Sequence, residues 1–317
     1  MSFVYRAYHA AAHQRNIVMS TKAGFPTGAT YIFARMLKKL MDEHKPEYMI
    51  ACMEGGPGVS GFREKLYPEY KANRKGETPY DLQRQLPYMH ELIGCYHLPK
   101  INFPGFEADD IIGTLAKRFY DQDPECQIFI VTGDKDMFQL VNERVFIVNP
   151  MKDLLADAQK VELIVGVPPS QVTDVMALRG DTVDNVPGAP GIGEKGSVSI
   201  IKEFGSLIAA LDRAGEIKRK GYRESLQNNR AQIELSKQLV TIDCNVPVTC
   251  SIADMKLIAQ DEDGLAKVYR ELEFASLLKK EELSAVEDFA EIVPPSATPT
   301  QTTMSEETAD KLIDSLF

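Results

Sequence analysis

The sequence predicts an α/β domain followed by a smaller helical domain, and two observations support this prediction. In the first half, segments of helical periodicity alternate with short apolar runs of strand length, as in an α/β sheet. After Gly166 no convincing strand follows until about 240–250, and the helical segments become short. We therefore expect a first domain over 1–165, a second over 166–282 and a tail over 283–317.

The expected elements can be placed in chain order. A helix is predicted at 27–44, where apolar residues recur along one face, and the apolar run EYMIACM at 47–53 is typical of a buried strand. Two helices and then two strands should follow, at 81–97, 107–120, 127–132 and 145–149. The short helices of the second domain are expected at 170–180, 193–205 and 229–242.

The charge of the chain is distributed unevenly. Residues 281–317 contribute −8 of the formal net charge of −10, which leaves −2 for residues 1–280. The low pI is therefore largely a property of the tail, and the acidic balance does not exclude a polyanionic partner.

Cysteine usage and hydropathy exclude several classes of protein. The five cysteines form no CxxC pair and have no histidine partners at zinc spacing, so neither a disulfide framework nor a zinc site is expected. The N-terminus has no apolar core of signal-peptide length, and no apolar run approaches a membrane span. We expect a soluble protein of the reducing cytoplasm that has no membrane partner.

Acidic residues gather at three places in the sequence. They open the helix at 107–120, follow the strand at 127–132, and lie in the stretch GDTVDN, as Glu107, Asp109, Asp110, Asp134, Asp136, Asp181 and Asp184. Taken singly, each group has an alternative interpretation as helix caps or ordinary loop acids. In an α/β sheet, however, strand ends and helix starts converge at the carboxyl edge.

If the acids converge, they require cations. Two carboxylates ~4 Å apart repel by about 4 kcal/mol at an effective dielectric of ~20. The ligands are hard oxygens, which favour Mg²⁺, with Mn²⁺ as a substitute, over Zn²⁺. Seven carboxylates exceed the needs of one ion and indicate a two-metal site that acts on a phosphodiester. Without these acids, residues 1–280 would carry a charge of about +5 and could face a polyanion.

Two segments are candidates for nucleic-acid contacts. FREKLYPEYKANRK at 62–75 interleaves cations with aromatic residues, which is typical either of a solvated amphipathic segment or of a clamp on a single strand. In VPGAPGIGEKG the glycines could let backbone N–H groups face a phosphate, although such loops are often only turns. The loop lacks the GKS or GKT of a nucleotide P-loop. The candidates are Arg63, Tyr67, Lys71, Arg74, Gly188, Gly191, Gly193 and Lys195.

These motifs, taken in order, resemble a known family. LYPEYKANR, GFEADDIIGTLA, VTGDKDMFQLV and VPPSQVTDVMALRGDTVDNVPGAPGIGEKG are similar to the 5′-3′ exonuclease and flap endonuclease family, including the N-terminal 5′ nuclease domain of bacterial DNA polymerase I. The resemblance covers about 2–275. It implies a PIN-like (Rossmann-like) α/β nuclease domain with a helical arch, followed by a helix-hairpin-helix (H3TH) domain that binds duplex DNA, often with K⁺.

The resemblance also implies roles for individual residues. It makes Glu107, Asp109, Asp110, Asp134 and Asp136 ligands of the catalytic metal, and Asp181 and Asp184 ligands of a second ion. It places Arg63, Lys71 and Arg74 at cationic positions of the arch, and Arg6 at a phosphate contact. The implied activity is Mg²⁺-dependent cleavage of DNA at 5′ flaps, nicks and 5′ ends.

The sequence departs from the family pattern at two places. Family members begin with an apolar strand ending in Asp-Gly, whereas this sequence begins at Met1, after that position, so we expect a start assigned too late or a shortened chain. The second strand of the family usually ends in Asp, where this sequence has Glu54, and Glu54 is expected to substitute for it. A DNA-binding protein of the same fold with impaired catalysis is therefore the alternative function.

Two further interpretations concern the tail and the GDKD motif. The end of the chain, DSLF, is expected either to finish a terminal helix or to bind the sliding clamp as a tethered peptide. GDKD also occurs in phosphatases of the haloacid dehalogenase type, but the early DxDx[TV] loop of that class is absent before residue 100.

Overall fold

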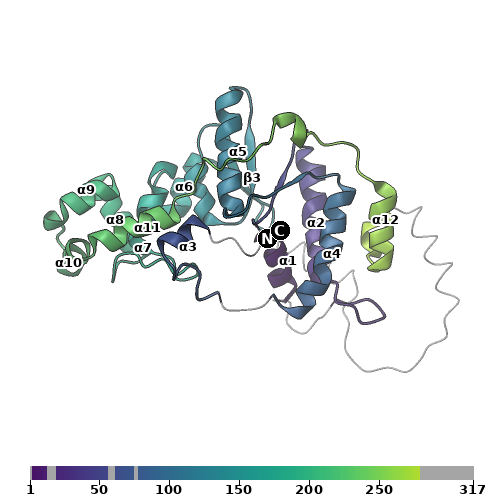
Figure 1. Cartoon of the computed structure of the whole chain (residues 1–317), viewed down its shortest axis with the longest axis horizontal. Coiled ribbons are helices and arrows are strands. Elements are labelled where there is room, and N and C mark those ends of the chain that lie inside the picture. The colour runs from purple at the N-terminus through teal and green to yellow at the C-terminus, as the bar shows by residue number, and fades with distance from the viewer. Residues whose placement is uncertain (1, 13–18, 56–60, 75–77, 279–317) are drawn as a thin grey trace.

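The computed structural model describes residues 2–12, 19–55, 61–74 and 78–278 (Figure 1). The expected tail at 283–317, with its DSLF end, lies outside the described residues. The sequence-predicted helices and strands of the body lie within them and can be compared with the structure.

The described strands form two small sheets around one helix. β1 (Ala51–Cys52) pairs in parallel with β2 (Lys100–Ile101). In the second sheet the central strand pairs in parallel on one side and antiparallel on the other, in the order β3 (Ile128–Val131), β4 (Val145–Asn149) and β5 (Leu154–Ala156). Helix α5 (Ala108–Gln122) contacts both β1 and β3. The predicted strands are confirmed, although the first is shorter than expected.

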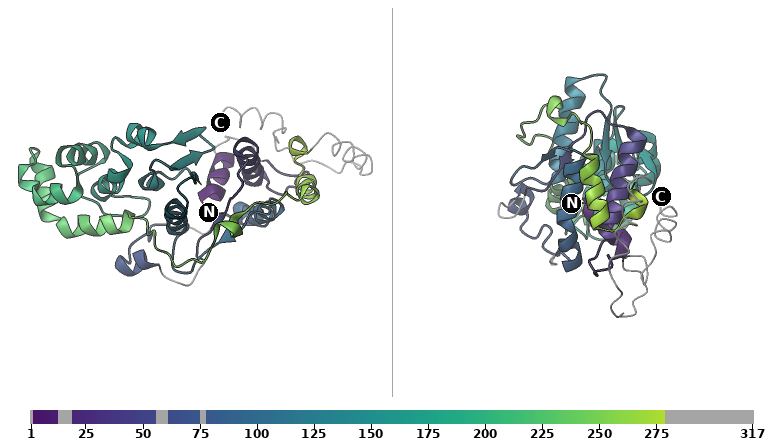
Figure 2. Two further views of the ribbon diagram at one scale, coloured as in Figure 1. Left: turned by 90° about the horizontal axis from the view of Figure 1, so that it is seen from above. Right: turned by 90° about the vertical axis from the view of Figure 1, so that its right-hand side faces the viewer.

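A helical layer with its own apolar core lies on one side of these sheets. Its buried residues include Tyr31, Met36, Leu92 and Phe274. The layer consists of α1 (Ser2–Ala12), α2 (Gly28–His44), α4 (Tyr80–Cys95) and α12 (Glu262–Glu271). Figures 1 and 2 show α12 beside α4, although the two helices are far apart in the sequence.

Short helices form a lobe at the other end of the molecule (Figure 1). Its members are α6 (Ala158–Val165), α7 (Val172–Arg179), α8 (Glu194–Phe204), α9 (Leu207–Asp212), α10 (Lys220–Asn228) and α11 (Arg230–Val240). Asp157 caps α6 by accepting the N–H of Lys160, and the helix ends at Gly166 in the left-handed region. The lobe shares one apolar core with the β3–β4–β5 sheet. The three predicted helices of this lobe are confirmed as α7, α8 and α11.

The chain returns to the first domain after α11. Residues 243–250 run along α5, where the Thr114 hydroxyl donates to the carbonyl of Asp243 and Arg118 donates to those of Val248 and Cys250. No strand forms between 240 and 250, because this described stretch bonds to side chains of α5 and joins no sheet. The second domain was expected to extend to 282, but α12 packs on α4 of the first.

The remaining described elements are short. Helix α3 (Phe62–Leu66) opens the basic segment that the sequence analysis singled out. Short 3₁₀ helices are η1 (Lys135–Leu140), η2 (Pro169–Gln171), η3 (Ala214–Glu216), η4 (Ile252–Met255) and η5 (Ala275–Leu277). No described helix is long and apolar enough to cross a membrane.

Candidate metal and nucleic-acid site

Three segments bring the predicted acids to one region. Glu107 caps α5 and forms a capping box with Asp110. These two acids therefore do cap the helix, and they also lie in the region of the predicted site. Asp134 follows β3 and caps η1 by accepting the N–H of Asp136. The third segment is the loop after α7, in which one oxygen of Asp181 accepts the N–H groups of two following residues. Local backbone bonds therefore hold the carboxylates of Glu107, Asp110, Asp134 and Asp181.

The pKa values show which acids are neighbours. Burial, followed by the charges of Asp134, Glu107 and Glu54, raises the pKa of Asp109 to about 7. Burial also raises the pKa of Asp136 to about 7, with further contributions from Asp134, Asp181 and Asp184. Asp134 is thus the common neighbour of two groups of carboxylates.

The donor set suits hard divalent cations. The neighbouring oxygens belong to carboxylates, and burial, followed by repulsion among them, raises the pKa of Asp109 and of Asp136 to about 7. Within the described ranges, no three His, Cys, Asp or Glu side chains stand in positions ready to hold one ion. By the chemistry of their oxygen atoms the residues fit a hard divalent cation, which would require the side chains to move closer together.

The raised pKa values predict an unusual pH dependence of stability. Between about pH 4 and 7, Asp109 and Asp136 bind more protons in the folded than in the unfolded protein, so stability falls as pH rises. In EDTA we expect Tm to increase by several degrees from pH 8 to pH 5.5, because each 1 kcal/mol corresponds to about 1.5 °C in a chain of this size. Calorimetry at both pH values measures this shift.

A matched variant checks the origin of the effect. The double variant Asp109→Asn and Asp136→Asn should show a flatter dependence of Tm on pH. Mg²⁺ should reverse the trend, since a bound cation favours the ionised carboxylates. A pH dependence unchanged in the double variant would assign the effect to other groups.

Cations of the basic segment contact the acids directly. The Lys71 ammonium lies 2.6 Å from an oxygen of Glu107 and 3.7 Å from one of Asp184. Arg74 also forms an ion pair with Asp184. The structure therefore brings both predicted cations to the carboxylates. There they can neutralise the acids or contact a phosphate.

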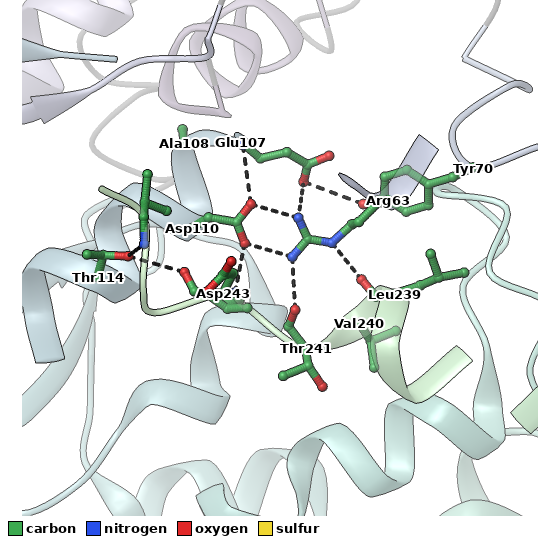
Figure 3. A network of polar contacts seen from close by, with 12 residues as sticks. Arg63, Tyr70, Glu107, Ala108, Asp110, Thr114, Leu239, Val240, Thr241 and Asp243 are labelled. Atoms are coloured by element: carbon green, nitrogen blue, oxygen red, sulfur yellow. Dashed lines mark hydrogen bonds and ion pairs between the residues drawn. The ribbon is translucent and has the colours of Figure 1, made fainter. Parts of the chain in front are cut away.

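Arg63 and Asp110 lie together in a buried network (Figure 3). The side chain of Arg63 is 6% exposed and that of Asp110 is 0% exposed. Neither has the open surface expected of a DNA contact or of a metal ligand. The neighbouring cations Lys71 and Arg74, on the same segment, are more exposed.

Arg6 and Glu54 lie at the edges of the acid cluster. The Arg6 guanidinium packs against Gly133 beside Asp134, and a Cβ at Gly133 would lie 1.8 Å from it, so a larger residue there would displace the Arg6 side chain. A carboxylate oxygen of Glu54 accepts the N–H of Ala108 at 3.3 Å, at the first turn of α5. Both residues therefore lie next to the predicted acids, Arg6 beside Asp134 and Glu54 beside the start of α5.

Two glycines close the loop that carries Asp181 and Asp184. Gly180 and Gly188 have φ of +71° and +63°, and a Cβ on Gly180 would lie 2.6 Å from the carbonyl oxygen of Val186. Gly188 donates its N–H to Ser236 at 3.0 Å and lacks the free N–H expected of a phosphate contact. Its role is to shape the loop.

The rest of the predicted hairpin is open. Gly191, Gly193 and Lys195 are exposed around the start of α8. Tyr67 is different, because it packs partly into the core and its hydroxyl donates to Glu69 at 2.7 Å. Gly191, Gly193 and Lys195 therefore remain available to a ligand, whereas Tyr67 is only partly accessible.

Tyr70 also lies at the site, although it was not among the site residues predicted from the sequence. Its ring is buried, and its hydroxyl lies 3.4 Å from oxygens of both Glu107 and Asp184. Burial and the nearby carboxylates raise the pKa of this phenol well above its usual value. The signal in the sequence was that Tyr70 directly precedes the predicted cation Lys71. In the structure both residues lie beside Glu107 and Asp184.

Family models match most of the chain. Residues 1–166 match the 5′-3′ exonuclease N-terminal resolvase-like domain, and residues 167–263 match the 5′-3′ exonuclease C-terminal SAM fold. The chain is 36% identical over 279 residues to a 5′-3′ exonuclease of Aquifex aeolicus, covering 88% of this chain and 92% of that relative. It is 33% identical over 315 residues to DNA polymerase I of Bacillus caldotenax, covering 98% of this chain but 35% of that relative.

Solved structures show the same fold. A T5 5′-exonuclease with bound zinc superposes with a TM-score of 0.63 at 20% identity, covering 92% of this chain and 96% of that one. The catalytic core of Rad2 in complex with a DNA substrate gives 0.55 at 17% identity, with 88% of each chain covered. These likenesses confirm the predicted nuclease fold with a helical second domain.

Proposed function

The chain belongs to the 5′-3′ exonuclease and flap endonuclease family, and from that premise we propose that it hydrolyses DNA phosphodiesters at 5′ flaps, nicks and 5′ ends. The observation that supports this proposal is the convergence of carboxylates from α5, η1 and the loop after α7, with Lys71 and Arg74 beside them. Two neighbouring groups of carboxylates could hold two cations, an arrangement that suits in-line displacement at a phosphodiester.

We propose a division of roles among the residues. Glu107, Asp109, Asp134 and Asp136 would hold one divalent cation, and Asp181 with Asp184 a second, with Mg²⁺ as the natural ion and Mn²⁺ as a substitute. Such ions, when bound, activate water and stabilise charge on the phosphate. Arg6, Lys71 and Arg74 would orient the phosphate through charge-assisted hydrogen bonds.

The hairpin would hold the duplex away from the acids. We propose that Gly191 and Gly193 offer backbone N–H groups, and Lys195 a charge, to one phosphate backbone, with K⁺ bound at the same hairpin. Residues 1–165 would then form the cleaving domain and the helical lobe after 166 the duplex-binding domain.

Cleavage of a labelled 5′-flap duplex tests the activity. We expect single-turnover cleavage in Mg²⁺ or Mn²⁺ and none in EDTA. A covalently closed circular duplex, which has no flap, nick or 5′ end, serves as the control for structure specificity. Binding of the flap without cleavage in either metal would instead support the catalytically impaired DNA-binding protein.

We also propose that the terminal DSLF sequence binds the sliding clamp. Ile313 stands where the short clamp-binding motif has Gln, so only the final residues provide the apolar anchors. Deleting Leu316 and Phe317 should weaken binding of the chain to the purified clamp by at least about tenfold, or about 1.4 kcal/mol. Ser305→Ala is the control, and unchanged affinity after the deletion would refute the proposal.

A further inference from the structure

The buried pair of Arg63 and Asp110 is the most completely bonded ionic contact near the acid cluster (Figure 3). Nη1 of Arg63 donates to Oδ2 of Asp110, and Nη2 donates to Oδ1, each at 2.7 Å. Two parallel bonds of this kind fix the angle as well as the distance between the two side chains. The pair therefore determines how α3 is oriented on the first turn of α5.

The bonding of Asp110 argues against a role as a metal ligand. Besides Arg63, Oδ1 accepts the N–H of Asp243 at 2.9 Å and Oδ2 accepts the N–H of Glu107 at 3.3 Å. These four donors match the roughly four acceptor sites of a carboxylate. An ion could bind Asp110 only after one of these buried donors had lost its partner, which is costly.

Arg63 also reaches the helical lobe. Its Nε donates to the carbonyl of Leu239 at 2.8 Å, and Nη2 donates to that of Thr241 at 2.9 Å, at the end of α11 (Figure 3). One side chain thus joins α3, α5 and α11. Lys71 and Arg74 follow on the same short segment as α3, so the position of Arg63 also determines where these cations stand.

We propose that Arg63 and Asp110 form a positioning pair that holds the basic segment and the helical lobe in register with the carboxylates. This inference rests on the proposed nuclease function. It assigns neither residue to the substrate or to the metal. Lysine cannot replace Arg63, because an ammonium group lacks the planar fork that makes two bonds to Asp110 and two to carbonyls.

The experiment compares Arg63→Lys and Asp110→Asn with the matched control Arg118→Lys. Arg118 also joins α5 to the returning chain through two carbonyls, but it lies near the other end of the helix. We expect Arg63→Lys and Asp110→Asn each to lower the single-turnover rate on a saturating flap about 100-fold, a loss typical of misplacement by about 1 Å. Flap affinity measured in EDTA should change less than threefold, and the double variant should be no slower than either single one.

Two further readouts separate positioning from other roles. Mg²⁺ titrated by calorimetry should bind Asp110→Asn as it binds the unaltered chain, whereas a metal ligand would lose binding. Arg118→Lys should lower Tm as Arg63→Lys does yet keep the rate within about twofold. An equal loss of rate in Arg118→Lys would mean that Arg63 and Asp110 contribute only to the general stability of the fold. Loss of Mg²⁺ binding in Asp110→Asn would mean that Asp110 is a metal ligand. Both outcomes overturn the proposal.

All rates are measured at least 15 °C below the lowest Tm, and Asp110→Asn keeps the test decisive if Arg63→Lys does not fold. If the unaltered chain cuts no flap, the proposed function fails first. In that case the thermal unfolding of the two single variants and the double variant still reports whether the two side chains are coupled. Additive losses of Tm would contradict the pair itself.

Discussion

Asp134→Asn should lower the rate of flap cleavage by about 1000-fold and leave flap binding nearly unchanged. Asp134 is the carboxylate that contributes to the raised pKa of both Asp109 and Asp136, so it stands between the two groups of acids. Removing one charge there weakens both proposed cation positions. A loss of about 4 kcal/mol of transition-state stabilisation corresponds to this factor.

The substitution is designed to preserve the fold. Asparagine is nearly isosteric and keeps an oxygen that can accept the N–H of Asp136, so the cap of η1 remains. Asp121→Asn, an exposed acid in the last turn of α5, is the control and should cut normally. Cleavage within tenfold of normal in Asp134→Asn would place the reaction elsewhere in the molecule.

Gly180→Ala should destabilise the protein by about 3–4 kcal/mol, although it adds only a single methyl group. The residue has φ of +71° and ψ of −176°, a backbone region that is almost restricted to glycine and costs an alanine about 1–3 kcal/mol. The added Cβ would also lie 2.6 Å from the carbonyl oxygen of Val186 and 3.0 Å from the backbone nitrogen of Gly188. Because two backbone segments would have to move apart, this clash adds to the cost of the dihedral angles.

Gly205→Ala provides the matched control for this prediction. Its φ is +83°, yet a Cβ there would meet nothing within 4 Å, so only the dihedral cost of about 1–2 kcal/mol applies. Urea unfolding of both variants measures the difference. Equal destabilisation would mean that the loop carrying Asp181 and Asp184 can open without cost, and that Gly188 does not close it.

The sequence predicted most of the fold because local patterns determine it. The apolar runs at β3 and β4 and the periodicity of α5, α8 and α11 depend on neighbouring residues, and the structure confirms them. The return of the chain after α11 could not be predicted, because residues 243–250 are held by side chains of α5 more than a hundred residues earlier. The two-residue strand β2 lacked a run long enough to give a signal.

In the candidate site, too, local patterns could be predicted from the sequence and long-range partners could not. The convergence of the acids follows from the geometry of strand ends and helix starts, and the structure brings the three groups together. The roles of Arg63 and Gly188 depend on partners contributed by α11, Leu239 and Ser236, which no local pattern identifies. The sequence shows only that residue 63 is a cation and that residue 188 is a glycine. Burial and hydrogen-bond partners determine what Arg63 and Gly188 can bind.

The packing of α12 on α4 has a consequence for the order of assembly during synthesis. The first domain begins at the N-terminus of the chain. Its helices α2 and α4 can pack against Leu265, Val268 and Phe274 only after the whole helical lobe has been translated. Chain connections of such long range close slowly, because loop entropy must be lost first. The helices of the helical lobe follow one another directly in the sequence. This lobe can therefore finish folding on the ribosome before the N-terminal domain, which is synthesised first.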